Sequence, residues 1–213
     1  MAEGNNVVAF EGDPLDNPAF KRYLEQQQSS SNAMPKPEIA FVKEFVAKTD
    51  IVELMSEWAF AVVNPQLIHE NLRLEPTEGQ STGANFVKLK LCKKNIHGQL
   101  PASISNLKCL CYINLGFNNL KGPIPTTICE LTALEELWMD HNQFTGTIPA
   151  ALGNLKRLQQ VSFSANKLQG EVPASTFELQ ELRRLNVSMN YLSGMVEMEV
   201  RFENEMPHCL FIY

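Results

Sequence analysis

The chain has 213 residues, of which 44% are hydrophobic and 20% are charged, so its composition is that of a soluble globular protein and excludes wholesale disorder. The formal net charge of −6 argues against a protein whose main task is to bind the phosphate backbone of nucleic acid. No stretch approaches the roughly eighteen consecutive apolar residues of a membrane-spanning helix.

Residues 1–37 are polar, contain several prolines and a Gln-Gln-Gln-Ser-Ser-Ser run, and are predicted to form a flexible or extended arm. Residues 38–82 are predicted to form a helical N-terminal cap. Two apolar faces there have helical spacing, and a capping box starting at Asp50 divides them. The faces are Ile39, Val42, Phe45 and Val46, then Ile51, Leu54, Met55, Trp58 and Val62. We expect these helices to cover an open apolar end of the repeats that follow, with partner binding as the alternative.

Residues 83–197 repeat with a period of 24 residues. A glycine marks every period, a proline follows three residues after each of the first four glycines, and an asparagine precedes each of the last four. The glycines are Gly98, Gly122, Gly146, Gly170 and Gly194, and the asparagines are Asn118, Asn142, Asn166 and Asn190. Lys94 replaces the asparagine of the first copy, and Glu197 replaces the proline of the last. We interpret both departures as capping repeats.

Each position of the repeat has a physical role. Apolar pairs two residues apart, such as Ile113 and Leu115, place both side chains on one face of a short strand. One coil cannot bury these side chains alone, so coils must stack. Each asparagine is expected to satisfy backbone groups of its own turn and of the next coil. Glycine lets the backbone bend, and proline fixes φ on the return path.

Residues 198–213 are predicted to form a C-terminal cap or tail. Its final apolar run, Cys209 to Tyr213, is expected to seal the end of the stack, and would invite association if it were exposed. The five cysteines lack the spacing of a disulfide framework or a zinc site, so we expect reduced thiols that fill space. They are Cys92, Cys109, Cys111, Cys129 and Cys209.

The repeats spell L-x-x-L-x-x-L-x-L-x-x-N-x-L-x-G-x-I-P, most clearly from Leu107 to Pro125 and from Leu131 to Pro149. This pattern resembles the plant-type leucine-rich repeat family. The resemblance implies an α/β solenoid: a right-handed leucine-rich repeat superhelix of about five repeats, with a short parallel sheet on its concave side. It also implies that proteins or peptides bind that side. Secreted members usually begin with a signal peptide and a cysteine-paired cap, and neither is evident here.

Alignment of the repeats predicts which side chains face the concave surface. The predicted partner-binding residues are Tyr112, Asn114, Phe117, Glu136, Trp138, Asp140, His141 and Arg184. Aromatic side chains on a rigid sheet are common binding anchors, and the alternative is that they pack against each other on neighbouring strands. Basic residues flank the acidic middle: Lys88, Lys90 and Lys93 at one end, Arg183 and Arg184 at the other. Five strands offer on the order of 300 Å², which suits a short peptide or one helix.

The sequence predicts no catalytic residue, metal site or cofactor. Its four histidines are isolated, and its glycines follow the structural period instead of forming a phosphate-binding loop. His141 near Asp140 and Glu136 has the composition of an acid–base cluster. An open sheet lacks the enclosed pocket that such chemistry needs.

Three functions remain as hypotheses. The first is a non-catalytic protein–protein interaction module that binds a protein or peptide through the concave face and terminal segments. The second is a structural or assembly subunit of a larger multiprotein complex, held by the arm and caps. The third is an inhibitor of a hydrolase or a receptor-like signalling protein. No nucleic-acid partner is expected. Because no signal peptide is visible, the expected location is intracellular and cytoplasmic, or an organelle interior if a transit peptide has been removed.

Overall fold

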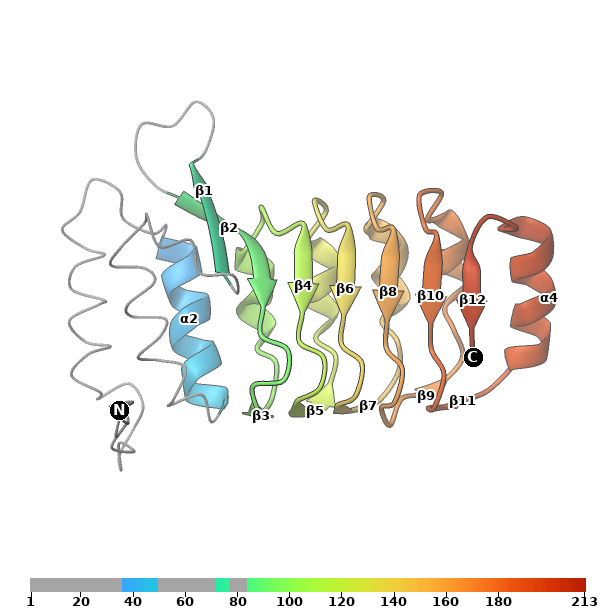
Figure 1. The fold of residues 1–213 in the computed structure, drawn as a ribbon, viewed down its shortest axis with the longest axis horizontal. Helices are drawn as coiled ribbons and strands as arrows, with labels where there is room; N and C mark the ends of the chain where they lie inside the picture. The colour runs from blue at the N-terminus through green and yellow to red at the C-terminus, as the bar shows by residue number, and fades with distance from the viewer. Residues whose placement is uncertain (1–35, 50–71, 77–83) are drawn as a thin grey trace, which may run out of the picture.

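The computed structural model describes residues 36–49, 72–76 and 84–213, and there the chain forms a stack of coils between two terminal helices (Figure 1). One continuous sheet of seven strands runs along the stack, with the strand order β1-β2-β4-β6-β8-β10-β12. The strands from β2 onward pair in parallel. Their bounds are β2 (Ala84–Lys90), β4 (Tyr112–Asn114), β6 (Glu136–Trp138), β8 (Gln160–Ser162), β10 (Arg184–Asn186) and β12 (Leu210–Ile212).

Short strands and 3₁₀ helices form the remaining sides of each coil. The short strands are β3 (His97–Gly98), β5 (Asn119–Pro123), β7 (Gln143–Thr145), β9 (Gln169–Gly170) and β11 (Tyr191–Leu192). The 3₁₀ helices are η2 (Ala102–Asn106), η3 (Thr126–Glu130), η4 (Ala150–Asn154) and η5 (Ala174–Glu178). The solenoid predicted from the repeat, with its parallel sheet, is confirmed.

The register of the sheet reproduces the 24-residue period. Tyr112 pairs with Glu136, and Glu136 pairs with Gln160, so equivalent positions of successive repeats lie side by side. The predicted apolar pairs, among them Ile113 with Leu115, are buried in one continuous core that extends from the N-terminal helix to the C-terminal helix. Each coil therefore buries the apolar side chains of its neighbours, which one coil could not do alone.

The asparagines join successive coils, as Asn142 illustrates. Its Oδ1 accepts a hydrogen bond from the Leu120 amide at 3.0 Å, and its Nδ2 donates to the carbonyls of Leu115, Met139 and Asp140 at 2.9–3.2 Å. The pattern recurs at Asn118, Asn166 and Asn190. The predicted bonds to the asparagine's own turn are confirmed. The predicted direction of the inter-coil bonds was wrong, because these bonds reach the preceding coil and not the next one.

Helix α2 (Lys36–Lys48) covers the N-terminal end of the core. The predicted burial of Val42 and Phe45 is confirmed, and Phe41 is buried beside them. The end of the helix is fastened to the first coil, since the Gln99 amide donates to the Lys48 carbonyl at 3.1 Å. The helix begins two residues inside the range predicted for the arm. The rest of that arm and the predicted second helix lie outside the described residues.

A strand also belongs to the N-terminal cap. The residues 38–82 were predicted to form a helical cap, but β1 (Leu72–Pro76) pairs antiparallel with β2. The segment predicted as a helical cap thus contains a strand as well as helix α2. Physically, β1 occupies the backbone groups of β2 that would otherwise form an unpaired sheet edge.

Helix α4 (Met195–Glu205) lies at the other end of the stack, beside β12 (Figure 1). It begins before residue 198, so the capping segment starts inside the range predicted for the repeats. Glu197 lies in the first turn of this helix, where a carboxylate interacts favourably with the helix dipole. The position that holds proline in earlier repeats has thus become part of a helix.

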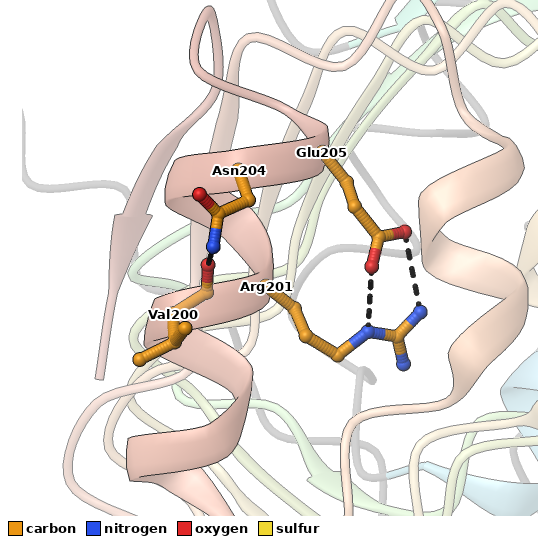
Figure 2. Close-up of polar contacts among 4 residues, drawn as sticks. All are labelled: Val200, Arg201, Asn204 and Glu205. Atoms are coloured by element: carbon orange, nitrogen blue, oxygen red, sulfur yellow. Dashed lines mark hydrogen bonds and ion pairs between the residues drawn. The ribbon is translucent and has the colours of Figure 1, made fainter.

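Aromatic side chains hold α4 against the last coil. The ring of Phe202 lies 4.8 Å from Phe177 and 4.3 Å from Phe211, and the Arg201 guanidinium lies 3.9 Å from the centre of the Phe177 ring. Figure 2 shows Arg201 donating from Nε and Nη2 to the two carboxylate oxygens of Glu205, at 2.9 and 3.3 Å. This hydrogen bonding raises the pKa of Arg201 and lowers that of Glu205. The pair therefore keeps the guanidinium in its stacking position.

The C-terminal run seals the core only in part. Cys209 is buried, but Leu210 and Tyr213 are 57% and 49% exposed. Burial raises the pKa of the Cys209 and Cys129 thiols to about 11, so both stay protonated near neutral pH. These two cysteines fill space as predicted, whereas Cys109 is exposed and Cys92 and Cys111 are half-buried.

Thr176 breaks the apolar pattern of the 3₁₀ helices. It occupies the position that Ile104, Ile128 and Leu152 hold in earlier coils, and it is fully buried. Its Oγ1 has no hydrogen-bond partner among the described residues. A buried hydroxyl without a partner keeps the cost of its desolvation.

We therefore expect Thr176→Val to raise the free energy of unfolding by about 1–2 kcal/mol, because valine has the same shape and no hydroxyl. Urea denaturation measures this. The matched control is Thr127→Val. The Thr127 hydroxyl donates to the Ala102 carbonyl at 2.7 Å, so its removal should not raise the free energy of unfolding. A loss of stability in Thr176→Val would show that the hydroxyl is satisfied in solution.

Candidate functional site

The candidate site is the solvent-facing side of the seven-stranded sheet, called the concave face below. In β4, β6 and β10 the central residue is buried and the two outer residues are half-buried, as alternation along a strand requires. The register forms two columns across the sheet. They are Lys88, Tyr112, Glu136, Gln160, Arg184 and Leu210, and Lys90, Asn114, Trp138, Ser162, Asn186 and Ile212.

Tyr112 is fixed in place by its neighbours. The Lys88 ammonium lies 4.4 Å from the centre of the Tyr112 ring, a cation–π contact between β2 and β4. The Asn114 Nδ2 donates to the Tyr112 hydroxyl at 3.2 Å, and the Asn114 Oδ1 accepts from the Gly116 amide at 3.1 Å. Because the ring is held on two sides, little conformational entropy is lost when a ligand packs on it.

Trp138 is oriented by Glu136 on the same strand. The indole Nε1 donates to the Glu136 Oε2 at 2.9 Å, and both residues are half-buried. The other carboxylate oxygen of Glu136 takes no part in this hydrogen bond. The two side chains together offer a flat aromatic surface beside a negative group.

Phe117 and His141 lie where the strands β4 and β6 run into the following turns. Their rings stack with centres 4.2 Å apart, and the Lys93 ammonium lies 5.2 Å from the Phe117 ring centre. All three residues have a left-handed backbone, with φ of 51–58°. Ala165 and Met189 share this conformation in the later coils, so it is a property of the turn in every repeat. Phe117 is 48% exposed, which leaves one side of the stack open to solvent.

Asp140 follows β6 and is half-buried. Gly116 makes room for it, because a Cβ on Gly116 would lie 2.9 Å from the Asp140 Oδ1. Arg184 stands apart from this group, two strands beyond Glu136 on β10. Its Nε is buried and has no hydrogen-bond partner among the described residues.

The structure therefore groups seven of the eight predicted residues on β4, β6 and the turns that follow them, and it places Arg184 in the same column two strands away. Phe117 stacks on a ring of the next coil, as the packing interpretation predicts, and is also 48% exposed to solvent. The alignment of the repeats also predicts that Ser162 and Ser164 lie on the exposed face. This prediction was wrong, because both serines are buried, with their hydroxyls 3.2 Å apart. Their short side chains lie too low to reach solvent.

Sequence reasoning missed two contributions to this surface. Lys88 and Lys93 contact aromatic rings of the next coil, a pairing that the 24-residue alignment places side by side. β12 extends the two columns by Leu210 and Ile212. The continuous apolar run from Cys209 to Tyr213 was the signal for this strand.

The described residues contain no group of three or more His, Cys, Asp or Glu side chains arranged to hold a metal ion. The five cysteines, which lie in the described segment 84–213, form no disulfide with one another. In the parts of the chain for which the structure gives coordinates, neither helix has the length and apolarity to cross a bilayer.

The family model named Leucine Rich Repeat matches residues 109–131 and 133–155. Among curated proteins, no sequence matches the chain significantly. Many solved structures resemble its fold.

Among those that are at least 25% identical to the chain are three with TM-scores above 0.5. A chain of the BIR3–SERK2 complex from Arabidopsis thaliana is 25% identical with a TM-score of 0.62, over 74% of this chain and 84% of that one. The structure of PEPR1–AtPEP1 is 28% identical with a TM-score of 0.60, over 73% of this chain and 21% of that one. The BIR2 ectodomain from Arabidopsis thaliana is 30% identical with a TM-score of 0.51, over 57% of this chain and 62% of that one. The chain thus spans about a fifth of one of these proteins and most of another.

Proposed function

Since the chain folds as a leucine-rich repeat solenoid like those of plant receptor ectodomains, we propose that it is a non-catalytic recognition module that binds a peptide or protein segment on its concave face. The observation that carries this proposal is the row of fixed and partly exposed aromatic side chains at Tyr112, Phe117 and Trp138. Aromatic residues of this kind supply much of the binding energy at protein interfaces. The BIR3–SERK2 complex supports the proposal, because there a similar solenoid belongs to an assembly of two proteins.

The size of the concave face favours a narrow ligand. Six parallel strands at a spacing of ~4.8 Å span ~24 Å, and the exposed strand length is ~16 Å, which together give ~380 Å². A standard protein interface buries about 800 Å² on each partner. A peptide laid along the solenoid axis therefore uses this surface fully, whereas a globular partner needs further contacts at the ends.

The proposal is tested by selecting peptides from a random library displayed on phage. We expect peptides that bind the wild-type chain to lose at least tenfold in affinity on the double variant Tyr112→Ala with Trp138→Ala, since both anchors are removed. The matched control is Tyr191→Ala, which removes a tyrosine that is 68% exposed on β11, away from the concave face. Peptides that bind the double variant as tightly as the wild type would contradict the proposal.

A second candidate function is that of an assembly subunit, and the outer side of α4 favours it. Val196 and Val200 on this helix are 69% and 52% exposed, and Leu210 on the neighbouring strand is 57% exposed. Exposed apolar groups near one end of a solenoid suit a further contact in a complex. Removal of residues 1–37, the segment predicted to hold the subunit, should release it from a co-purified complex under this hypothesis.

We further propose an intracellular location. The five cysteines, which form no disulfide with one another, support it, because thiols persist in reducing compartments and oxidise readily outside them. Microscopy of the full chain with a C-terminal fluorescent tag tests this, and signal in the medium would contradict it.

A further inference from the structure

We propose that the concave face selects a proline-rich peptide with an acidic, a basic and a second acidic side chain, each three residues after the one before. This inference rests on the proposed function above and adds the class of ligand and the spacing of its charges. It follows from the order of charges along one column of the sheet, from the strand spacing and from the placement of the aromatic rings.

The charges in the first column alternate in sign. Lys88 on β2, Glu136 on β6 and Arg184 on β10 are each half-buried and lie in register, with one intervening strand between each pair. Lys90 strengthens the first positive position, and Asp140 the negative one. The ion pairs recorded among the described residues involve none of these five side chains. Lys88 instead lies over the Tyr112 ring, and Glu136 accepts from the Trp138 indole, so a ligand would meet charges that uncharged neighbours already orient.

The spacing of the charges matches a polyproline II helix. Two strand intervals cover ~9.6 Å, and a polyproline II helix advances ~9.3 Å in three residues, which is one full turn. Every third side chain of such a helix points the same way. In a β-strand, by contrast, the third residue along faces the opposite side. A ligand in the polyproline II conformation can thus present all three charges to the column at once.

The aromatic residues favour the same conformation. Tyr112 lies in the column between Lys88 and Glu136, and Trp138 lies beside Glu136 on the same strand. Grooves lined with aromatic rings are the usual docking surface for proline-rich segments. Prolines between the charged residues would pack on these two rings. The order of charges in the column is the same read from either end. The column therefore selects the spacing of the ligand's charges and not the direction in which its chain runs.

Three labelled peptides test the inference by fluorescence anisotropy with the full chain at physiological salt. The matched peptide is Glu-Pro-Pro-Arg-Pro-Pro-Glu, the shifted one is Glu-Pro-Arg-Pro-Pro-Pro-Glu, and the inverted one is Arg-Pro-Pro-Glu-Pro-Pro-Arg. We expect the matched peptide to bind about fivefold more tightly than the shifted one, because a single ion pair is lost. It should bind about 100-fold more tightly than the inverted one, in which all three pairs become repulsive.

A charge exchange separates ligand recognition from damage to the fold. The variant Glu136→Arg should bind the matched peptide at least about fivefold more weakly and should prefer Glu-Pro-Pro-Glu-Pro-Pro-Glu, whose central charge is reversed. Restored binding cannot come from a misfolded protein. Glu136→Gln is the second variant. It should lower the affinity for the matched peptide without changing the circular dichroism spectrum of the protein.

Equal affinity for the matched and shifted peptides would overturn the inference. If library peptides still depend on Tyr112 and Trp138 in that case, the proposed function stands and only the charge spacing fails. If neither the library nor the three peptides bind in a manner that depends on these two residues, the proposed function fails as well.

Discussion

Replacing Asn142 with alanine is expected to lower the free energy of unfolding by about 3 kcal/mol. The Asn142 side chain is buried, and its Oδ1 accepts the hydrogen bond from the Leu120 amide. Its Nδ2 also donates to the Leu115 carbonyl of the preceding coil. Alanine would leave the buried Leu120 amide without this partner, and an unsatisfied buried group costs about 1–3 kcal/mol on top of the lost contacts. Urea denaturation of the full chain measures the change.

Asn119→Ala is the matched control for this experiment. The Asn119 Nδ2 donates to the Asn95 Oδ1 at 2.8 Å, and this bond is exposed to water. The control should lose less than about 1 kcal/mol, because water replaces the missing partner. Equal losses in the two variants would mean that the buried asparagines do not hold the coils together.

Gly98→Ala is expected to detach helix α2 from the solenoid. A Cβ at this position would lie 1.8 Å from the Lys48 carbonyl oxygen, and Gly98 has a φ of +103°. Since the obstacle is backbone, the end of α2 must move away. The side chains of Phe41, Val42 and Phe45 then lose burial that stabilises each by about 1.5–3 kcal/mol. We expect a loss of at least about 3 kcal/mol, with faster amide hydrogen exchange in residues 36–49.

Gly146→Ala separates this clash from the strain of the turn itself. Gly146 has a φ of +75°, but the nearest atom to its Cβ would be the Pro123 Cβ at an ordinary contact distance of 3.7 Å. Alanine there should cost only the roughly 1–2 kcal/mol of a left-handed residue. The same loss in both variants, with unchanged exchange in α2, would show that the contact of Gly98 with α2 contributes nothing.

The repeated part of the fold could be predicted because each position of the repeat has the same structural role in every coil, such as burial in the core or exposure on the sheet. Ile113 and Leu115 are buried in their coil because the stack repeats the same environment every 24 residues. The period also placed Tyr112 beside Glu136 correctly. Where the environment changes, the period no longer decides the structure. Glu197, which replaces the proline of the last repeat and was interpreted as part of a capping repeat, lies in the first turn of helix α4 instead of in another coil.

The ends and the finer geometry of the site depend on contacts that no repeat pattern contains. β1 pairs with β2 because the sheet has an edge there, a fact about the assembled sheet rather than about residues 72–76. The exposed columns were predictable from alternation. The stacking of Phe117 on His141 was not, because it requires the left-handed backbone of both turns. Thr176 is likewise buried at a position that is apolar in the other coils, although its side chain is polar.

The central claim is that the concave face binds the ligand, and the most direct measurement is a map of amide chemical shifts. The isotopically labelled full chain is titrated with a peptide selected from the random library. The account predicts the largest shift changes in Tyr112–Asn114 and Glu136–Trp138, the strands that carry the fixed aromatic residues. Changes concentrated in the 3₁₀ helices or in α4, with these two strands unaffected, would contradict it.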